Sequence, residues 1–289
     1  MNNISHAAPF ASVIQLMKWK RYKEALVEAE HLLTAHPEDP YLFALIARIY
    51  SLQDQHEKAL HWAREALTRD PEQPLAWYVR VCVYYETDDE RAFGEAIEQA
   101  LRIDPYEADY YFFRANRLLK KGKFQASKEQ LEAALEIAPE HSLYLSALSY
   151  VEALLGNSAA SRQLDRQAAR HDVEQPYVLL HLAWAAGRRG EYELQETYMK
   201  QAVRLNPDDK QFQNEYLEAL QHNNKLFRLF LGPVRLLQRL KTWQILVSWI
   251  VAWLLFKPLV LLFILLYVLA HWLTKAVVHV RVFGFRRRP

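Results

Sequence analysis

The sequence predicts an all-α fold in which helical repeats stack into a solenoid, followed by a C-terminal hydrophobic helical hairpin. Three observations lead to this prediction. Only 7 of the 289 residues are glycine, which favours helix over strand. Several residue types recur every 34 residues through the first three quarters of the chain. Near the C-terminus, two long apolar segments flank a Lys-Pro pair.

The 34-residue interval is carried by three residue types in one register. Self-similarity at a fixed period is the signature of stacked supersecondary units. Proline, alanine and glycine each keep their own place within the unit. The series are Pro37, Pro71, Pro105, Pro139 and Pro207; Ala66, Ala100, Ala134, Ala168 and Ala202; and Gly122, Gly156 and Gly190.

Each period divides into two helical halves. In the second period these are "PYLFALIARIYSLQD" and "HEKALHWAREALTRD", both with apolar residues at spacings of three and four. The glycines fall between the halves, where a tight turn needs a residue that tolerates positive φ. The alanines fall on the second half, where a small side chain lets helices approach closely. Neither helix buries its apolar face alone, so we expect neighbouring pairs to stack.

This pattern closely resembles the tetratricopeptide repeat (TPR). The resemblance is clearest in the fourth unit, "ADYYFFRANRLLKKGKFQASKEQLEAALEIAPEH", residues 108–141. It implies a protein-binding array rather than a catalyst. We expect a domain over residues 1–222 that ends in a capping helix near 210–222. The six units lie near residues 6–39, 40–73, 74–107, 108–141, 142–175 and 176–209.

The repeats contain no recognisable catalytic or metal-binding motif. HExxH, CxxC, GxSxG and a glycine-rich phosphate loop are all missing from the sequence. His56 and His61 are five residues apart, which puts them on different helix faces. Asp88 and Asp89 are expected to cap the following helix. Cys82, the single cysteine, is expected to be a small apolar residue. We therefore expect no enzyme activity, no cofactor and no metal site.

The TPR resemblance implies a concave groove lined by the first helix of each repeat. Its composition, rich in tyrosine with a few cations, suits peptide binding. The alternative is that some rings only pack between helices, chiefly Phe112 and Tyr78. A carboxylate clamp is not expected, because Phe112 and Phe113 stand where its Lys and Asn belong. The predicted groove residues are Tyr41, Arg48, Tyr78, Cys82, Tyr85, Asp109, Phe112, Asn116, Lys120, Tyr150, Tyr177, Trp184 and Arg188.

The C-terminal part of the chain differs sharply in charge from the repeats. The segment 1–222 holds 25 Lys and Arg against 34 Asp and Glu, whereas the segment 223–289 holds 11 Lys and Arg and no acid. The segment 223–241 is basic and apolar, which suits a membrane surface with anionic lipids better than nucleic acid. The expected headgroup contacts are Lys225, Arg228, Arg235, Arg239, Lys241, Arg286, Arg287 and Arg288.

Residues 242–274 are predicted to form a hydrophobic hairpin. As one helix, the apolar stretch would be about 48 Å long, against a hydrocarbon core of ~30 Å. It would also place Lys257 and Pro258 at mid-bilayer. A turn at Lys257 and Pro258 avoids both costs and puts the basic segment 223–241 and the basic tail 275–289 on one side. The alternative is that the two arms are buried in a protein core or an oligomer interface.

Together these features predict a membrane-anchored adaptor or assembly scaffold that binds a protein or peptide partner. The arrangement is similar to bacterial TPR proteins with a C-terminal hydrophobic anchor. The N-terminus shows no secretory signal, so we expect the bacterial inner membrane with the repeats facing the cytoplasm. The rival hypothesis is a pore-forming protein whose hairpin inserts or oligomerises under control of the repeats. The sequence names no partner and leaves oligomerisation open.

Overall fold

The computed structural model describes residues 10–171, 174–224, 247, 250, 261–277 and 280. Over these residues the regular secondary structure is helical, with no strand. They fall into two compact units, which are described separately. The first unit runs to Arg117 and includes Glu136–Ala138, and the second comprises Leu118–Leu135 and the described residues from Pro139 onward.

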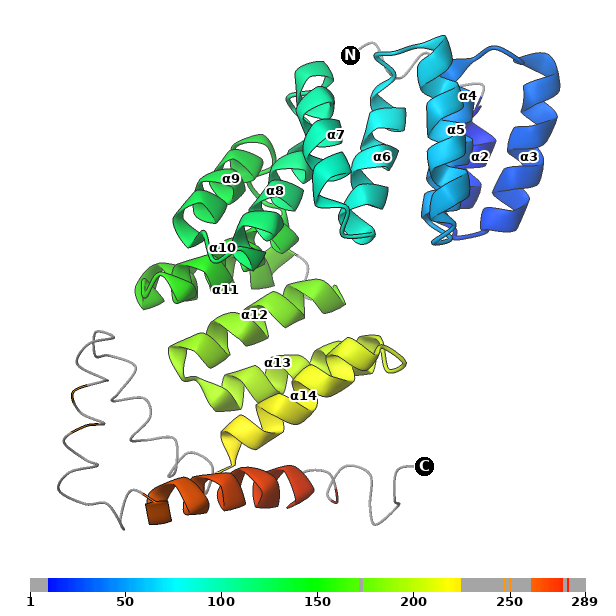
Figure 1. The fold of residues 1–289 in the computed structure, drawn as a ribbon. Coiled ribbons are helices and arrows are strands. Elements are labelled where there is room, and N and C mark those ends of the chain that lie inside the picture. The colour runs from blue at the N-terminus through cyan, green and yellow to red at the C-terminus, as the bar shows by residue number, and fades with distance from the viewer. Residues whose placement is uncertain are drawn as a thin grey trace. The chain divides into compact units, whose positions relative to one another are not determined.

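The first unit is built from antiparallel helix pairs (Figure 1). Helix α8 begins in this unit and ends in the second. Two apolar clusters, centred on α4 with α2 and α3 and on α4 with α5 and α6, form most of its core. Its helices are α2 (Ala11–Lys18), α3 (Tyr22–Ala35), α4 (Pro40–Ser51), α5 (His56–Arg69), α6 (Pro74–Glu86), α7 (Glu90–Ile103) and α8 (Ala108–Lys120).

The second unit continues the same pattern of paired helices. Its core contains the buried faces of α12, α13 and α14. Residues 261–277 are also helical and bear most of the exposed large apolar side chains of this unit. The labelled helices are α9 (Phe124–Ile137), α10 (Ser142–Leu154), α11 (Ser158–His171), α12 (Pro176–Arg189), α13 (Tyr192–Leu205) and α14 (Lys210–Asn223).

The helices keep the register that the sequence predicts. From α4 onward each first helix starts one full period after the first helix before it, and from α3 onward the second helices do the same. The prediction of an all-α helical-repeat fold is therefore confirmed for the described repeats. The start positions are Pro40, Pro74, Ala108, Ser142, Pro176 and Lys210 for α4, α6, α8, α10, α12 and α14, and Tyr22, His56, Glu90, Phe124, Ser158 and Tyr192 for the second helices.

The turn inside each repeat contains one residue in the left-handed region. Gly122, Gly156 and Gly190 have φ of 71°, 89° and 81°, as the sequence predicts. The same position in the three preceding repeats is taken by Lys20, Asp54 and Asp88, with φ of 59°, 57° and 61°. Aspartate tolerates this conformation better than most residues, but lysine has no such advantage.

One prediction about helix capping is right and its companion is wrong. The Asp89 carboxylate accepts a hydrogen bond from the Ala92 backbone N–H and caps α7, as expected. Asp88 does not cap the helix. It adopts the left-handed turn conformation, and its side chain pairs with Arg117 instead.

The repeated alanines explain how closely the helices approach. Four of the five are completely inaccessible and the fifth, Ala100, is 1% exposed. A larger side chain at these positions would force the second helix of a repeat away from its neighbours. The set is Ala66, Ala100, Ala134, Ala168 and Ala202.

The predicted hairpin is not supported by the structure. Its turn residues Lys257 and Pro258 and almost all of its first arm lie outside the described residues. Part of the second arm lies in the helical residues 261–277. In the described part of the chain, no helix combines the length and the apolar character needed to cross a membrane. The predicted headgroup residues Lys225, Arg228, Arg235, Arg239, Lys241, Arg286, Arg287 and Arg288 also lie outside it.

Candidate functional site

The predicted groove residues all lie on first helices of the repeats. Some of these residues lie in the first compact unit and the others in the second. A single groove that runs through both units therefore stays a prediction. In the first unit they are Tyr41 and Arg48 on α4, Tyr78, Cys82 and Tyr85 on α6, and Asp109, Phe112 and Asn116 on α8. In the second they are Lys120 at the end of α8, Tyr150 on α10, and Tyr177, Trp184 and Arg188 on α12.

In the first unit, four predicted side chains meet across α4, α6 and α8. The Arg48 guanidinium lies 4.8 Å from the centre of the Tyr78 ring, and its Nη1 donates to Cys82 Sγ at 3.6 Å. The Tyr78 hydroxyl donates to the Asp109 carboxylate at 2.6 Å. Among the described residues, Arg48 has no carboxylate within ion-pair distance. Burial raises the pKa of Glu86 and of Glu107, and the nearby Arg48 opposes this in both.

Burial sets the protonation of this cluster. It raises the pKa of the Cys82 thiol to about 11, so Cys82 is a neutral thiol near pH 7. Burial also raises the pKa of the Tyr78 hydroxyl, which keeps it protonated as a donor to Asp109. The geometry thus fits the prediction that Cys82 is a small buried side chain rather than a nucleophile.

Two of the predicted groove rings pack against other side chains of the repeats. Phe112 is only 8% exposed. The Tyr85 ring lies 4.8 Å from the Phe113 ring and 5.0 Å from the Arg117 guanidinium. The burial of Phe112 favours the alternative that its ring packs between helices. The contacts of Tyr85 show that its ring also takes part in packing. Little of the Phe112 ring is left for a ligand, whereas Tyr85 is half-buried.

In the second unit, predicted groove residues of α10 and α12 form aromatic contacts with each other and with α14. The Tyr150 and Trp184 rings are 5.4 Å apart, and the Trp184 Nε1–H donates to Glu215 at 2.8 Å. Burial raises the pKa of Tyr150, while the nearby Arg188 lowers it. Tyr177 is 53% exposed, with its ring 5.4 Å from that of buried Phe212. We call Tyr150, Tyr177, Trp184 and Arg188 the aromatic patch.

Sequence reasoning missed two buried arginines. The Arg117 side chain, 7% exposed, pairs with Asp88 and Glu90 and donates to the backbone carbonyl oxygen of Tyr85 at 2.7 Å. The Arg189 side chain, 1% exposed, pairs with Asp165 and Glu191. Both arginines hold neighbouring repeats together by contacts with the preceding repeat.

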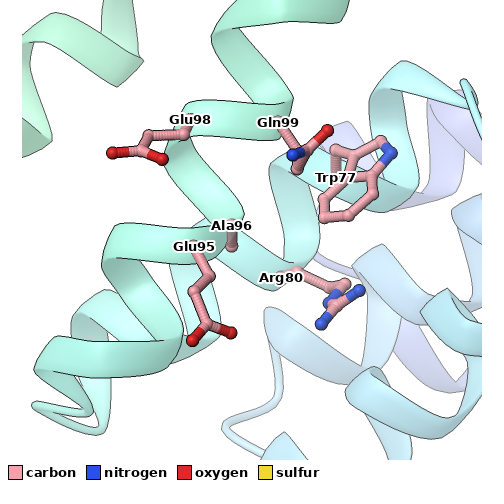
Figure 2. A pocket seen from close by; sticks show the side chains of 6 residues that line it. All are labelled: Trp77, Arg80, Glu95, Ala96, Glu98 and Gln99. Carbon is pink, nitrogen blue, oxygen red and sulfur yellow. The ribbon is translucent and has the colours of Figure 1, made fainter.

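Sequence reasoning also missed a hollow between α6 and α7. It has a volume of about 340 Å³ and is lined by Trp77, Arg80, Glu95, Ala96, Glu98 and Gln99. Figure 2 shows the Trp77 ring beside Gln99, with the Arg80 side chain extending away from Glu95. The Arg80 guanidinium lies 4.8 Å from the centre of the Trp77 ring, so these two lining side chains contact each other.

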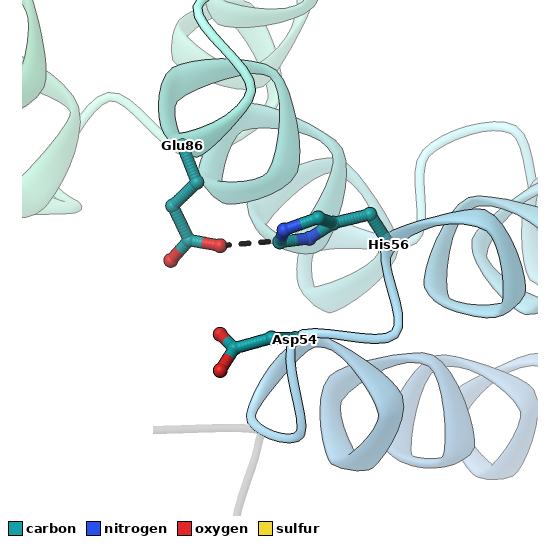
Figure 3. Close-up of side chains that lie close together, drawn as sticks. All are labelled: Asp54, His56 and Glu86. Carbon is teal, nitrogen blue, oxygen red and sulfur yellow. Dashed lines mark ion pairs between the residues drawn. The ribbon is translucent and has the colours of Figure 1, made fainter.

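A third group that the sequence did not bring together consists of Asp54, His56 and Glu86. Their potential ligand atoms all lie within 4.8 Å of one another (Figure 3). Sequence reasoning compared His56 only with His61 on the same helix. The partner carboxylate instead comes from the first helix of the next repeat.

Three of the repeats match a known sequence family. The tetratricopeptide repeat family model matches residues 41–73, 108–141 and 176–209. No curated protein matches the sequence.

Solved structures share the fold at low sequence identity. A chain of the APC/C hetero-tetramer Cut9–Hcn1 superposes with a TM-score of 0.65 and 15% identity, and the match covers 74% of this chain and 42% of that one. The chain therefore spans less than half the length of that relative. PilF of Pseudomonas aeruginosa gives a TM-score of 0.59 and 17% identity over 73% of this chain and 94% of that one. The type IV pilus biogenesis factor PilW superposes with a TM-score of 0.57 and 19% identity, over 74% of this chain and 99% of that one.

At these identities the superpositions establish the fold alone. The family match and the helix register agree on the repeat type. Three stretches of this chain, residues 41–73, 108–141 and 176–209, therefore match the tetratricopeptide repeat, and they lie within the helical-repeat fold.

Proposed function

We propose that the chain is a non-catalytic adaptor or assembly scaffold that binds a protein partner through the first helices of its repeats. The observation that supports this most strongly is the aromatic patch of the second unit. Tyrosine, tryptophan and arginine are the residue types enriched at energetically important interface positions. Tyr177 and Arg188 are exposed on α12, the helix that also bears half-buried Trp184, and the Trp184 ring contacts that of Tyr150.

The chemistry of the patch indicates the class of segment that it would bind. The rings offer flat apolar surfaces, and Arg188 is a cation with no carboxylate in ion-pair contact within the described residues. An extended partner segment with apolar or aromatic side chains beside an acidic one would complement both. A catalytic role has no comparable support, because the buried thiol of Cys82 is protonated and the sequence lacks any catalytic motif.

Binding can be tested with a double substitution in the patch. Tyr150→Ala with Tyr177→Ala is expected to weaken partner binding by about 30-fold, the scale of a loss of ~2 kcal/mol at a hot spot. Trp184 is left intact because its hydrogen bond to Glu215 also supports the fold. The partner is captured on the immobilised chain from solubilised membranes and identified. Its affinity for each variant is then measured by calorimetry.

Tyr106→Ala is the matched control, since Tyr106 is 79% exposed but precedes α8 in the first unit. It should bind as the parent does, and all variants should keep the parent's helicity. Equal affinity of the double variant and the parent would remove the patch from the binding site.

We further propose that the C-terminal part of the chain attaches this scaffold to a lipid bilayer. Two observations support it. The segment 223–289 contains 11 cations and no acidic residue. Ten large apolar side chains are exposed on the helical residues 261–277. Exposed apolar area of this extent on one helix marks an interaction surface. The ten are Leu261, Leu262, Ile264, Leu265, Leu266, Val268, Leu269, Trp272, Leu273 and Val277.

Membrane attachment predicts a flotation result. The full chain should float with vesicles that contain anionic phospholipid. Glutamate at Leu265, Leu269 and Trp272 should abolish flotation, because these exposed positions lie on one helix face and a charge there opposes lipid burial. Val27→Glu, at an exposed position of α3, is the control and should float.

The same vesicles separate the scaffold from the rival, pore-forming hypothesis. If they carry an entrapped dye, an adaptor leaves them sealed and a pore former releases the dye. A parent chain that stays at the bottom of the gradient in the presence of vesicles would contradict membrane attachment altogether.

A further inference from the structure

We propose that Asp54, His56 and Glu86 form a binding site for one divalent transition-metal ion of the Zn²⁺ class, which joins the second repeat to the third. Asp54 lies in the turn between α4 and α5, His56 is the first residue of α5, and Glu86 is the last residue of α6. The site is separate from the aromatic patch, and nothing in the partner-binding proposal depends on it.

The geometry of the three side chains suits shared coordination. His56 Nδ1 lies 3.8 Å from Glu86 Oε2, which is too long for a hydrogen bond. Two ligands of one tetrahedral zinc ion stand about 3.4 Å apart, given metal–ligand distances of about 2.0–2.2 Å. The potential ligand atoms of all three residues lie within 4.8 Å of one another, so small rotamer adjustments bring them onto one ion. Figure 3 shows the Glu86 carboxylate directed at the His56 ring, with Asp54 beside it.

The donor atoms have no other partner in the described part of the chain. His56 Nδ1 is shielded from solvent and makes no hydrogen bond. A buried polar nitrogen without a partner costs free energy unless something binds it. Apart from the approach of Glu86 to His56, no ion pair or hydrogen bond joins the Asp54 or Glu86 carboxylate to another described residue. One imidazole nitrogen and two carboxylates form a donor set that suits Zn²⁺ and leaves a position for water.

Other junctions between repeats supply an internal comparison. Asp88 and Glu90 occupy the positions of Asp54 and His56 one repeat later, and there both carboxylates pair with Arg117. At the next junction, Lys128 pairs with Glu152 at 2.8 Å. At the one after that, Arg189 pairs with Asp165 and Glu191. Each of these junctions holds its carboxylates with a cationic side chain.

The junction of the second and third repeats has no such side chain among the described residues. Arg48 lies close enough to lower the pKa of Glu86, but it stands over the Tyr78 ring and donates to Cys82. A bound cation would take the place that Arg117 and Arg189 fill elsewhere. Metal binding would then fix the turn of one repeat to the end of the first helix of the next.

Titration of the full chain with Zn²⁺ tests the site. The protein is freed of metal with a chelator and studied without an affinity tag. Calorimetry should give one Zn²⁺ per chain, and the melting temperature should rise with Zn²⁺ concentration because the ion binds only the folded state. Co²⁺ should give the visible absorption of a four- or five-coordinate ion. Mg²⁺, which prefers octahedral oxygen ligands, should have no effect.

Substitutions then assign the ligands. His56→Gln and Glu86→Gln should each weaken Zn²⁺ binding at least tenfold and remove the Co²⁺ absorption. His61→Gln, on the same helix but on another face, should bind as the parent does. His56→Arg supplies an internal cation, so its melting temperature should no longer respond to Zn²⁺.

Two results would overturn the proposal. One is a parent chain that shows neither saturable binding of one ion nor a thermal shift. The other is the double variant His56→Gln with Glu86→Gln retaining the parent affinity while its helicity is unchanged. If one variant fails to fold, Asp54→Asn provides the second test at an exposed turn position.

Discussion

Replacing Arg189 with methionine is expected to lower the free energy of unfolding of the second unit by about 3–5 kcal/mol, the usual cost of removing one partner from a buried ion pair. The Arg189 side chain is 1% exposed and the Asp165 side chain 8%. Without the guanidinium, Asp165 keeps only the hydrogen bond from Ser149 among the contacts described for it. A carboxylate left in this position is poorly solvated, which is the physical source of the loss.

The loss should depend on pH in a defined direction. Burial already raises the pKa of Asp165 in the parent, and Arg189 opposes this. Without Arg189, the pKa of Asp165 in the folded state rises further above its unfolded value. A carboxyl with a raised folded-state pKa favours the folded state when protonated, and that contribution is lost as pH rises. The variant should therefore be closest to the parent at low pH and furthest from it above neutral pH.

Urea unfolding followed by circular dichroism measures the free energy of unfolding of the parent and the variant, once at low pH and once above neutral pH. Arg188→Met is the control, because Arg188 is the exposed neighbour on the same helix and makes no ion pair within the described residues. It should unfold within about 0.5 kcal/mol of the parent, as surface substitutions do. Equal losses in the two variants would contradict the structural role assigned to Arg189.

Replacing Phe212 with alanine is expected to cost about 3–5 kcal/mol, as truncation of a fully buried phenylalanine does. Phe212 has no exposed surface and belongs to a cluster with Leu179, Leu180 and Met199. It is the main apolar anchor of α14, the helix that follows the last repeat. Its removal should leave a cavity and loosen α14 from α12 and α13.

The effect is measured by urea unfolding together with hydrogen exchange of the α14 amides. Phe212→Leu keeps most of the volume and should cost much less. Gln211→Ala, at the exposed neighbouring position, should have little effect. Unchanged exchange of the α14 amides in Phe212→Ala would mean that α14 does not depend on this contact.

The fold was predictable because each repeat imposes the same physical demand at the same place. A small residue must stand where helices approach, as Ala134 does, and a residue tolerant of positive φ must stand in the turn, as Gly122 does. The turn positions of the earlier repeats could not be predicted in this way. Asp88 looks like a helix cap in the sequence, and only its backbone conformation and the approach of Arg117 show otherwise.

The polar junctions were not predictable for a related reason. An arginine on an amphipathic helix, such as Arg117, has the same local sequence context whether it is buried or solvated. Its partners Asp88 and Glu90 are 29 and 27 residues away, which helical periodicity does not reveal. A similar separation hid the approach of Glu86 to His56. Ring packing at Tyr85 likewise depends on the neighbouring repeat.

The central claim is that the first helices of the repeats bind a protein partner, and site-specific photocross-linking tests it most directly. A photoreactive phenylalanine analogue is placed at Tyr177 or, in a separate chain, at Tyr106, which is also well exposed. Irradiation in cells that make the protein should give a discrete cross-linked partner from position 177 and none from 106. The cross-link should disappear when Tyr150→Ala is added. Cross-linking from position 106 alone, or from neither position, would contradict the account.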